Sequence, residues 1–282
     1  MTPPIVGVDV GGTSTRAVSF DGSLVALDSA VAATPRGATA IADLVTELVG
    51  DVAAAPSGVA IGVPGRVDPV RGMVSSAVNL GITTPALIGE LVRARLDVPV
   101  HVENDVNAAA LGAFAHFGLA PAQSLAYVNV GTGIAAGFVL AGRLWRGASG
   151  GAGEIGHVPM QALGPACRCG QAGCAEAVGS GRAVADDPGR RDDVVVATAW
   201  AVQLCIMTVD VDVVAVGGGM TRPGDSFLPS LLATLARREK MSPMLADIGL
   251  ARRVVLAPAD IPLGSLGAVL AARDGQTRPV GA

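Results

Sequence analysis

The chain has 282 residues, of which half are hydrophobic and 16% are charged, and its formal net charge is −4. This length is typical of a protein with two domains, and the high apolar content excludes an intrinsically disordered chain. No run of the sequence is rich in lysine or arginine, so we expect no nucleic-acid partner.

The first residues, MTPPIVGVDVGG, lack the basic and apolar regions of a secretory signal peptide and favour a first strand. The longest apolar block, 194–209, is shorter than the roughly 18 residues of a membrane-spanning helix and favours a buried helix. We therefore expect a cytoplasmic protein with no membrane partner. In that reducing compartment, closely spaced cysteines more often bind metal than form disulfides.

The first half of the chain alternates short apolar strands with amphipathic helices. Strands are predicted at four places: 5–10, 16–20, 59–63 and 98–102. Helices are predicted over 41–52, from Thr84-Pro85 to Leu96, and after the capping residues Asn104 and Asp105. Asp21-Gly22 is typical of a hairpin turn after the second strand.

The second half repeats this order. Strands are predicted at 125–130, 134–140, 211–216 and 253–257. Helices are predicted at 192–209, 227–235 and 264–273. Strands that alternate with helices indicate an α/β fold, and the repeated strand, glycine turn and strand suggest two related lobes.

Three glycine-rich turns follow predicted strands: DVGGTSTR at 9–16, GTGIAAG at 131–137 and VGGGM at 216–220. Glycine lets backbone N–H groups approach a phosphate without interference from a Cβ atom. One such turn is an ordinary hairpin in most proteins. Three turns at strand ends favour nucleotide binding.

Three cysteines form a C-x-C-x₄-C cluster at Cys167, Cys169 and Cys174, and His157 lies ten residues upstream. Three thiolates and one imidazole would complete a tetrahedral zinc site without an open position, which is typical of structural zinc. A Cys167–Cys174 disulfide is the competing interpretation, and it needs an oxidising compartment. Cys205 lies in an apolar predicted helix, where a free buried thiol is the common state.

Five motifs together resemble the ROK family of sugar kinases and related repressors: DVGGTSTR, ENDVNAA at 103–109, GTGIAAG, GEIGH at 153–157 and CRCGQAGCAE at 167–176. They occur in the family's order, and the cysteine motif is the most specific. The resemblance implies an α/β fold similar to actin, hexokinase and ribonuclease H. Two ribonuclease H-like lobes, 1–115 with the last helix (about 264–274) and 116–263 with the zinc motif, would close across an interlobe cleft.

The resemblance also implies roles for individual residues. Asp9 would help to hold Mg²⁺, and Asp105 would be the catalytic base that removes the proton of the attacking sugar hydroxyl. The ATP contacts would come from Gly11, Gly12, Thr13, Thr132, Gly133, Gly217, Gly218 and Gly219. The sugar contacts would come from Gly65, Asn79, Asn104, Asp105, Glu154, His157 and Glu176. His157 would bind zinc with one ring nitrogen and touch the sugar with the other side of the ring.

Two of these residues have a simpler interpretation. Asp105 fits the capping of a helix, and Asn79 fits a turn before Gly81. The sequence also departs from the family pattern at three places: GITTPAL at 81–87, Ala135 and Ala136 in the second glycine turn, and ADDPGRRD at 185–192, where a longer helical segment is usual.

We therefore expect an ATP-dependent hexose kinase, with O6 of glucose as the first candidate acceptor and N-acetylglucosamine or N-acetylmannosamine as rivals. The resemblance also suggests a homodimer. A sugar-responsive repressor is the second hypothesis, although only eight residues precede Asp9. A catalytically weak sugar sensor is the third, because the 185–191 region is short.

Overall fold

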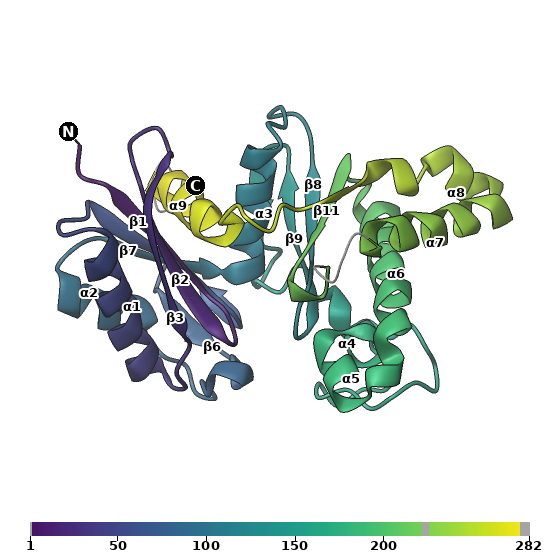
Figure 1. The fold of residues 1–282 in the computed structure, drawn as a ribbon, viewed down its shortest axis with the longest axis horizontal. Helices are drawn as coiled ribbons and strands as arrows, with labels where there is room; N and C mark the ends of the chain where they lie inside the picture. The colour runs from purple at the N-terminus through teal and green to yellow at the C-terminus, as the bar shows by residue number, and fades with distance from the viewer. Residues whose placement is uncertain (1, 222–225, 277–282) are drawn as a thin grey trace. The chain divides into compact units, whose positions relative to one another are not determined.

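The computed structural model describes residues 2–221 and 226–276, and the chain divides into two compact units. Unit 1 comprises Met1–Gly118, Arg146–Gly151 and Pro262–Ala282, and unit 2 comprises Leu119–Trp145 and Ala152–Ile261. Figure 1 follows the chain through both units. The contacts group Arg146–Gly151 with unit 1, whereas the division expected from the sequence assigned this segment to the second lobe.

Unit 1 contains a five-stranded sheet of order β3-β2-β1-β4-β7. Its strands are β1 (Ile5–Val10), β2 (Ser14–Phe20), β3 (Ala26–Ala33), β4 (Gly58–Val63) and β7 (Val100–Asn104). The first three strands are antiparallel neighbours, and β4 and β7 run parallel to β1. A small hairpin of β5 (Arg66–Asp68) and β6 (Met73–Ser75) follows β4.

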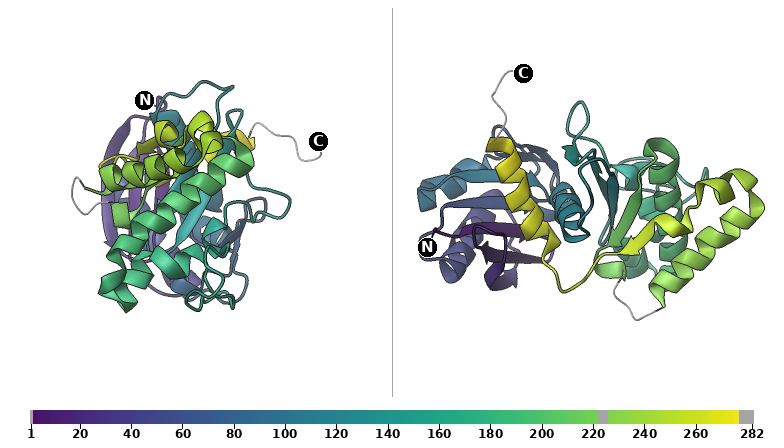
Figure 2. Two further views of the ribbon diagram at one scale, coloured as in Figure 1. Left: turned by 90° about the vertical axis from the view of Figure 1, so that its right-hand side faces the viewer. Right: turned by 90° about the horizontal axis from the view of Figure 1, so that it is seen from above.

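Two helices cover each face of this sheet, as Figures 1 and 2 show. One face carries α1 (Ala38–Val52) and α2 (Ile88–Leu96), and the other carries α3 (Asp105–His116) and α9 (Leu263–Gln276). The core-facing residues of α1 recur at helical spacing, as predicted: Ile41, Val45, Leu48, Val49 and Val52.

Glycines allow α3 and α9 to pack closely. A Cβ atom at Gly112 would collide with the backbone of Leu263, and one at Gly267 would collide with the carbonyl of Ala108. The interface therefore excludes side chains at these two positions and places the start of α9 against the middle of α3.

Unit 2 contains a second five-stranded sheet, of order β10-β9-β8-β11-β12. Its strands are β8 (Leu125–Val130), β9 (Ile134–Leu140), β10 (Arg143–Trp145), β11 (Val213–Gly217) and β12 (Val254–Leu256). The first three strands are again antiparallel and the last two parallel. The two sheets thus share one strand order, which confirms the repeat inferred from the glycine turns.

The helices of unit 2 are α4 (Ala175–Gly179), α5 (Gly181–Asp186), α6 (Arg191–Val209), α7 (Phe227–Met241) and α8 (Pro243–Ile248). Short 3-10 helices are η1 (Val78–Leu80) in unit 1 and η2 (Ile155–His157), η3 (Pro188–Arg190), η4 (Gly219–Thr221) and η5 (Ala251–Arg253) in unit 2.

Among the described residues, one helical stretch, Pro188–Val209, is long and apolar enough to cross a membrane. In the structure α6 packs into the core of unit 2 through Ala201, Val202 and Cys205, which are fully buried.

The structure corrects several local predictions. Helix α2 begins at Ile88 rather than at Thr84-Pro85, because Ala86 exchanges two backbone hydrogen bonds of 2.9 Å with Val74 and is therefore extended. Helix α8 was not predicted, and Ser242 caps its first turn. His101 lies on the edge strand β7, where it pairs with Ala60, and its Nε2 atom is buried although the residue as a whole is only partly buried.

Candidate functional site

The first glycine turn connects β1 to β2 in unit 1. The N–H of Gly11 donates to the carbonyl of Ser14 at 2.9 Å, which closes the turn. The side-chain amide of Asn79 lies beside Gly12, since its Nδ2 is 3.3 Å from the place of a Cβ atom there. Arg36 donates to the backbone carbonyls of Val78 and Asn79 and so fixes the position of this asparagine.

Asp9 lies immediately before this turn and faces the start of α9, because a Cβ atom at Gly264 would touch its carboxylate. Burial raises the pKa of Asp9 to about 6, and the nearby charge of Arg16 opposes this rise. A carboxylate with a raised pKa gains from a cation that neutralises it, so the position suits a metal ion.

A second group of predicted residues meets at the start of α3. Asn104 caps the helix, and its Oδ1 accepts from the N–H groups of Val106 and Asn107 at 3.0 Å each. Its Nδ2 donates to the carbonyl of Gly65 at 3.1 Å. Asp105 is the first residue of the helix, so unit 1 brings Gly65, Asn104 and Asp105 together.

The second glycine turn lies in unit 2, between β8 and β9, where the N–H of Gly131 donates to the carbonyl of Gly133. Glu176 reaches this turn from α4: its Oε2 accepts from the N–H of Ile134 at 3.2 Å and lies against Gly133. The structure thus places one predicted sugar ligand directly beside the predicted phosphate turn.

Sequence reasoning missed Arg182, which joins these two features. Its N–H donates to the carbonyl of Thr132 at 3.2 Å, and its guanidinium Nη1 lies 3.6 Å from Glu176 Oε1. Arg182 follows the motif residue Glu176 by six residues, at the end of the run GSGR. Its contact with Glu176 could not be predicted, because the spacing alone does not say which way the side chain points.

The third glycine turn follows β11. Gly218 has a φ of +101°, and a Cβ atom there would meet the Val130 carbonyl and the side chain of Asn129. Gly217 pairs with Asn129 in the sheet. The second and third glycine turns therefore lie at the same edge of the unit 2 sheet, as expected for residues that follow parallel strands.

The cysteine cluster forms a compact set of ligand atoms with His157. The four atoms from His157, Cys167, Cys169 and Cys174 all lie within 4.8 Å of one another. Cys169 Sγ and Cys174 Sγ are 3.6 Å apart, and Cys167 Sγ is 3.5 Å from His157 Nδ1. A tetrahedral zinc site with ordinary bond lengths has edges of about 3.8 Å between sulfurs and about 3.6 Å between sulfur and nitrogen, so the residues fit zinc.

The thiols of this cluster have different surroundings. Hydrogen bonds from Gln171 lower the pKa of Cys169 to about 6, whereas burial raises the pKa of Cys174 to about 12. A coordinating cation deprotonates such thiols outright. The four cysteines of the chain, all within the described residues, are free thiols, and Cys205 is buried in α6 away from the cluster.

His157 connects the cluster to Glu154. Its Nδ1 faces Cys167, while its Nε2 lies 4.0 Å from Glu154 Oε2. Glu154 is exposed, with 62% of its side chain accessible, and can therefore reach a ligand. The His157 ring therefore has Cys167 on one side and Glu154 on the other.

Known proteins resemble the chain over most of its length. The ROK family model matches residues 5–200. A glucokinase of Streptomyces coelicolor is 36% identical over 181 residues, which cover 64% of this chain and 57% of that protein. A putative xylose repressor of Caldicellulosiruptor is 41% identical over 127 residues, which cover 45% of this chain and 32% of that protein. The chain thus matches less than two thirds of the length of either relative.

A solved structure agrees with these matches. The ROK family glucokinase of Streptomyces griseus, in complex with glucose and AMPPNP, superposes with a TM-score of 0.81 and 26% identity, covering 96% of this chain and 100% of that one. Together with the strand order of both sheets and the family match over 5–200, this likeness shows that the chain belongs to the ROK family.

Proposed function

We propose that this protein is a cytoplasmic sugar kinase that transfers the γ-phosphoryl group of ATP to a hydroxyl of a hexose. The observation that carries the proposal is the start of α3, where Asn104 caps the helix, contacts Gly65 and presents Asp105. The glucokinase relative and the glucose-bound structural neighbour support a hexose acceptor. Glucose O6 is the first acceptor to test.

In the proposed reaction Asp105 accepts the proton of the attacking sugar hydroxyl. The hydroxyl oxygen forms a bond to the γ-phosphorus while the bond to the β-γ bridging oxygen breaks, and ADP leaves. Such transfers depend mainly on positioning and on neutralising phosphate charge. Asp9 would hold Mg²⁺, which supplies that neutralisation, and the three glycine turns would orient the nucleotide.

In unit 2, Glu154, His157 and Glu176 are the proposed sugar ligands, and His157 also belongs to a structural zinc site with Cys167, Cys169 and Cys174. The ligand distances support zinc at this place. A metal that fixes His157 from one side would orient its other nitrogen, as outer contacts orient metal ligands generally. The proposed sugar ligands from unit 1 are Asn104, Gly65 and Asn79.

Substitution of Asp105 by asparagine tests this function. Loss of the base should lower kcat by roughly 10²–10⁴-fold, while the sugar affinity stays within a few-fold, because an amide keeps the size and much of the hydrogen bonding of a carboxylate. The measurement is Mg-ATP-dependent ADP release with glucose, mannose, N-acetylglucosamine and N-acetylmannosamine, together with calorimetric sugar binding. Asp43→Asn, at an exposed position on α1, is the matched control. Full turnover in the Asp105 variant would contradict the proposed base.

The xylose repressor relative supports a second candidate, a sugar-responsive regulator or sensor that binds sugar without turnover. The same assay separates the two functions. Sugar binding by the zinc-loaded protein without ADP release on any of the four sugars would favour the sensor. Sedimentation at micromolar concentration tests the proposed homodimer.

A further inference from the structure

Glu103 is a buried acidic residue that the proposed reaction does not use. Glu103 is only 1% exposed, and it lies on β7 directly before Asn104 and Asp105. Its Oε1 accepts from the N–H of Asn104 at 3.0 Å and from the side-chain amide of Asn107 at 3.2 Å. One carboxylate oxygen therefore fixes the chain on both sides of Asp105.

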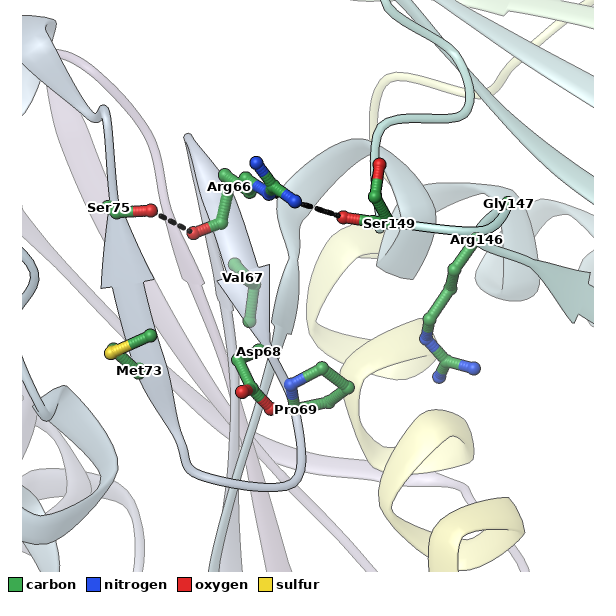
Figure 3. A pocket seen from close by; sticks show the side chains of 10 residues that line it. Arg66, Val67, Asp68, Pro69, Met73, Ser75, Arg146, Gly147 and Ser149 are labelled. Carbon is green, nitrogen blue, oxygen red and sulfur yellow. Dashed lines mark hydrogen bonds between the residues drawn. The ribbon is translucent and has the colours of Figure 1, made fainter.

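The other carboxylate oxygen is bound by Arg146. The Nε and Nη2 atoms of this arginine donate to Glu103 Oε2 at 2.8 Å and 2.6 Å. Arg146 belongs to the segment Arg146–Gly151, which unit 1 also holds through Arg66, whose guanidinium donates twice to the carbonyl of Ser149. Figure 3 shows the Arg66–Ser149 bond and Arg146 at the wall of a cavity of about 470 Å³.

The energetics of burial make this pair interdependent. Removing one partner of a buried ion pair is strongly destabilising because the other charge is left uncompensated, so the position of Glu103 depends on its contact with Arg146. Glu103 in turn contacts the backbone at Asn104, whose side chain caps α3. A displacement of Arg146 would therefore be passed to the first turn of α3 through two consecutive hydrogen-bonded contacts.

We propose that Arg146 and Glu103 are positioning residues for Asp105, and that the bonds from Arg146 to Glu103 and from Glu103 to Asn104 hold the carboxylate of Asp105 in its reactive place. This inference rests on the proposed function, in which Asp105 is the base. It assigns no proton transfer to Glu103, because that carboxylate is buried and bound on both oxygens. A role limited to stability would not require the contact with Asn104.

The first test is Arg146→Met, which keeps the length of the side chain and removes its charge and donors. We expect kcat to fall roughly 10–100-fold, as for other residues that orient a reactive group through a neighbour, and the KM for ATP to stay within about twofold. The matched control is Arg95→Met, which breaks the Arg95–Asp43 pair of 2.7 Å in the same unit. That variant should keep the kcat of the wild type. Arg146→Lys should recover part of the turnover because it restores one charged donor.

The second test separates positioning from stability. In the double variant Glu103→Gln, Arg146→Met no buried charge is left unpaired, so the melting temperature should recover while kcat stays low. Hydrogen exchange gives a readout that needs no activity. The amides of Asn104, Val106 and Asn107 should exchange at least tenfold faster in Arg146→Met than in the wild type, whereas their exchange rates in Arg95→Met should equal those of the wild type.

The outcomes distinguish the two proposals. A double variant that regains both melting temperature and turnover, or an Arg146→Met variant with wild-type kcat, would overturn the positioning role and leave the kinase function intact. Absence of turnover in the wild type would reject the kinase function. In that event unchanged exchange at Asn104–Asn107 would overturn the link between Arg146 and the start of α3, and faster exchange would support it.

Discussion

Asp9 and Glu103 are both acidic residues of the unit 1 sheet, but their surroundings differ in a way that matters for stability. Glu103 is matched by Arg146 and by two further donors. Burial is the dominant influence on Asp9, and the charge of Arg16 offsets only part of it. A buried carboxylate with too few charged or hydrogen-bonding partners destabilises the folded state when it ionises. Groups whose pKa values are perturbed in this way are common at ligand sites.

A pH dependence of stability follows for Asp9. Its pKa is about 6 in the folded protein, against 3.8 as the ordinary value, so the folded state holds the proton more tightly. Stability should therefore fall as pH rises between about 4 and about 6, by up to about 3 kcal/mol in total. Asp9→Asn should remove this part of the slope and raise the free energy of unfolding at pH 7. Urea unfolding without divalent cations at pH 4.5 and pH 7 measures both effects.

The control for this prediction is Asp51→Asn, at an exposed position near the end of α1, which should leave the slope as in the wild type. An Asp9→Asn protein with an unchanged slope would show that Asp9 titrates at its ordinary pKa. The same variant should lose Mg-ATP turnover, because the proposed cation ligand is gone, so stability and activity should move in opposite directions.

At the scale of elements, the contact between α3 and α9 positions two proposed site residues at once. Asp105 begins α3, and the first turn of α9 lies against Asp9. Gly112 sits at the centre of this contact, where a Cβ atom would overlap the backbone of Leu263. The helices can approach so closely only because this position has no side chain.

Gly112→Ala should therefore destabilise the protein by about 1–3 kcal/mol, the usual cost of an extra methyl group in a filled interface. Gly50→Ala is the matched control: Gly50 is also a helical glycine, in α1, but a Cβ atom there meets nothing within 4 Å. That variant should gain roughly 0.4–1 kcal/mol, because alanine restricts the unfolded chain. Urea unfolding midpoints measure both, and a Gly112→Ala protein as stable as the wild type would contradict the close packing.

At the scale of the whole molecule, each unit has its own hydrophobic core. The core of unit 2 includes Val128, Ile206 and Leu231, and that of unit 1 includes Val8, Ile61 and Val102. The cysteine cluster belongs entirely to unit 2. A change at the cluster should therefore affect the two units unequally.

Removal of the proposed zinc tests this expectation. Structural zinc contributes about 10–16 kcal/mol of binding free energy in small domains, which is comparable to the total stability of a domain, so chelation should destabilise unit 2 strongly. Hydrogen exchange after treatment with a chelator should increase around 155–176 and in α6, and much less in β1 and α1. Cys169→Ser should show the same pattern without a chelator. Equal increases in both units would contradict a structural metal confined to unit 2.

Much of the fold was predictable because its determinants are local. Apolar spacing identified the strands β1, β4, β8 and β9 and the helices α1, α6, α7 and α9, since burial on one face leaves a periodic pattern in the sequence. The glycine turns and the cysteine cluster could be recognised equally well in the sequence. The three cysteines lie within eight residues of one another in the sequence, and a backbone bridge between Pro159 and Cys174 places His157 near them.

Only the tertiary structure decided which distant side chains meet. Arg146 and Glu103 are 43 residues apart, and Glu176 and Ile134 are 42 residues apart, so neither pair leaves a periodic signal. The start of α2 depended likewise on a bridge between Ala86 and Val74. The sequence alone determined the family resemblance, the cysteine motif and the strands and helices with a periodic apolar pattern, because residue spacing encodes local geometry. The structure decided the partners of Glu103 and Glu176, because such contacts form only when the sheets and helices have packed.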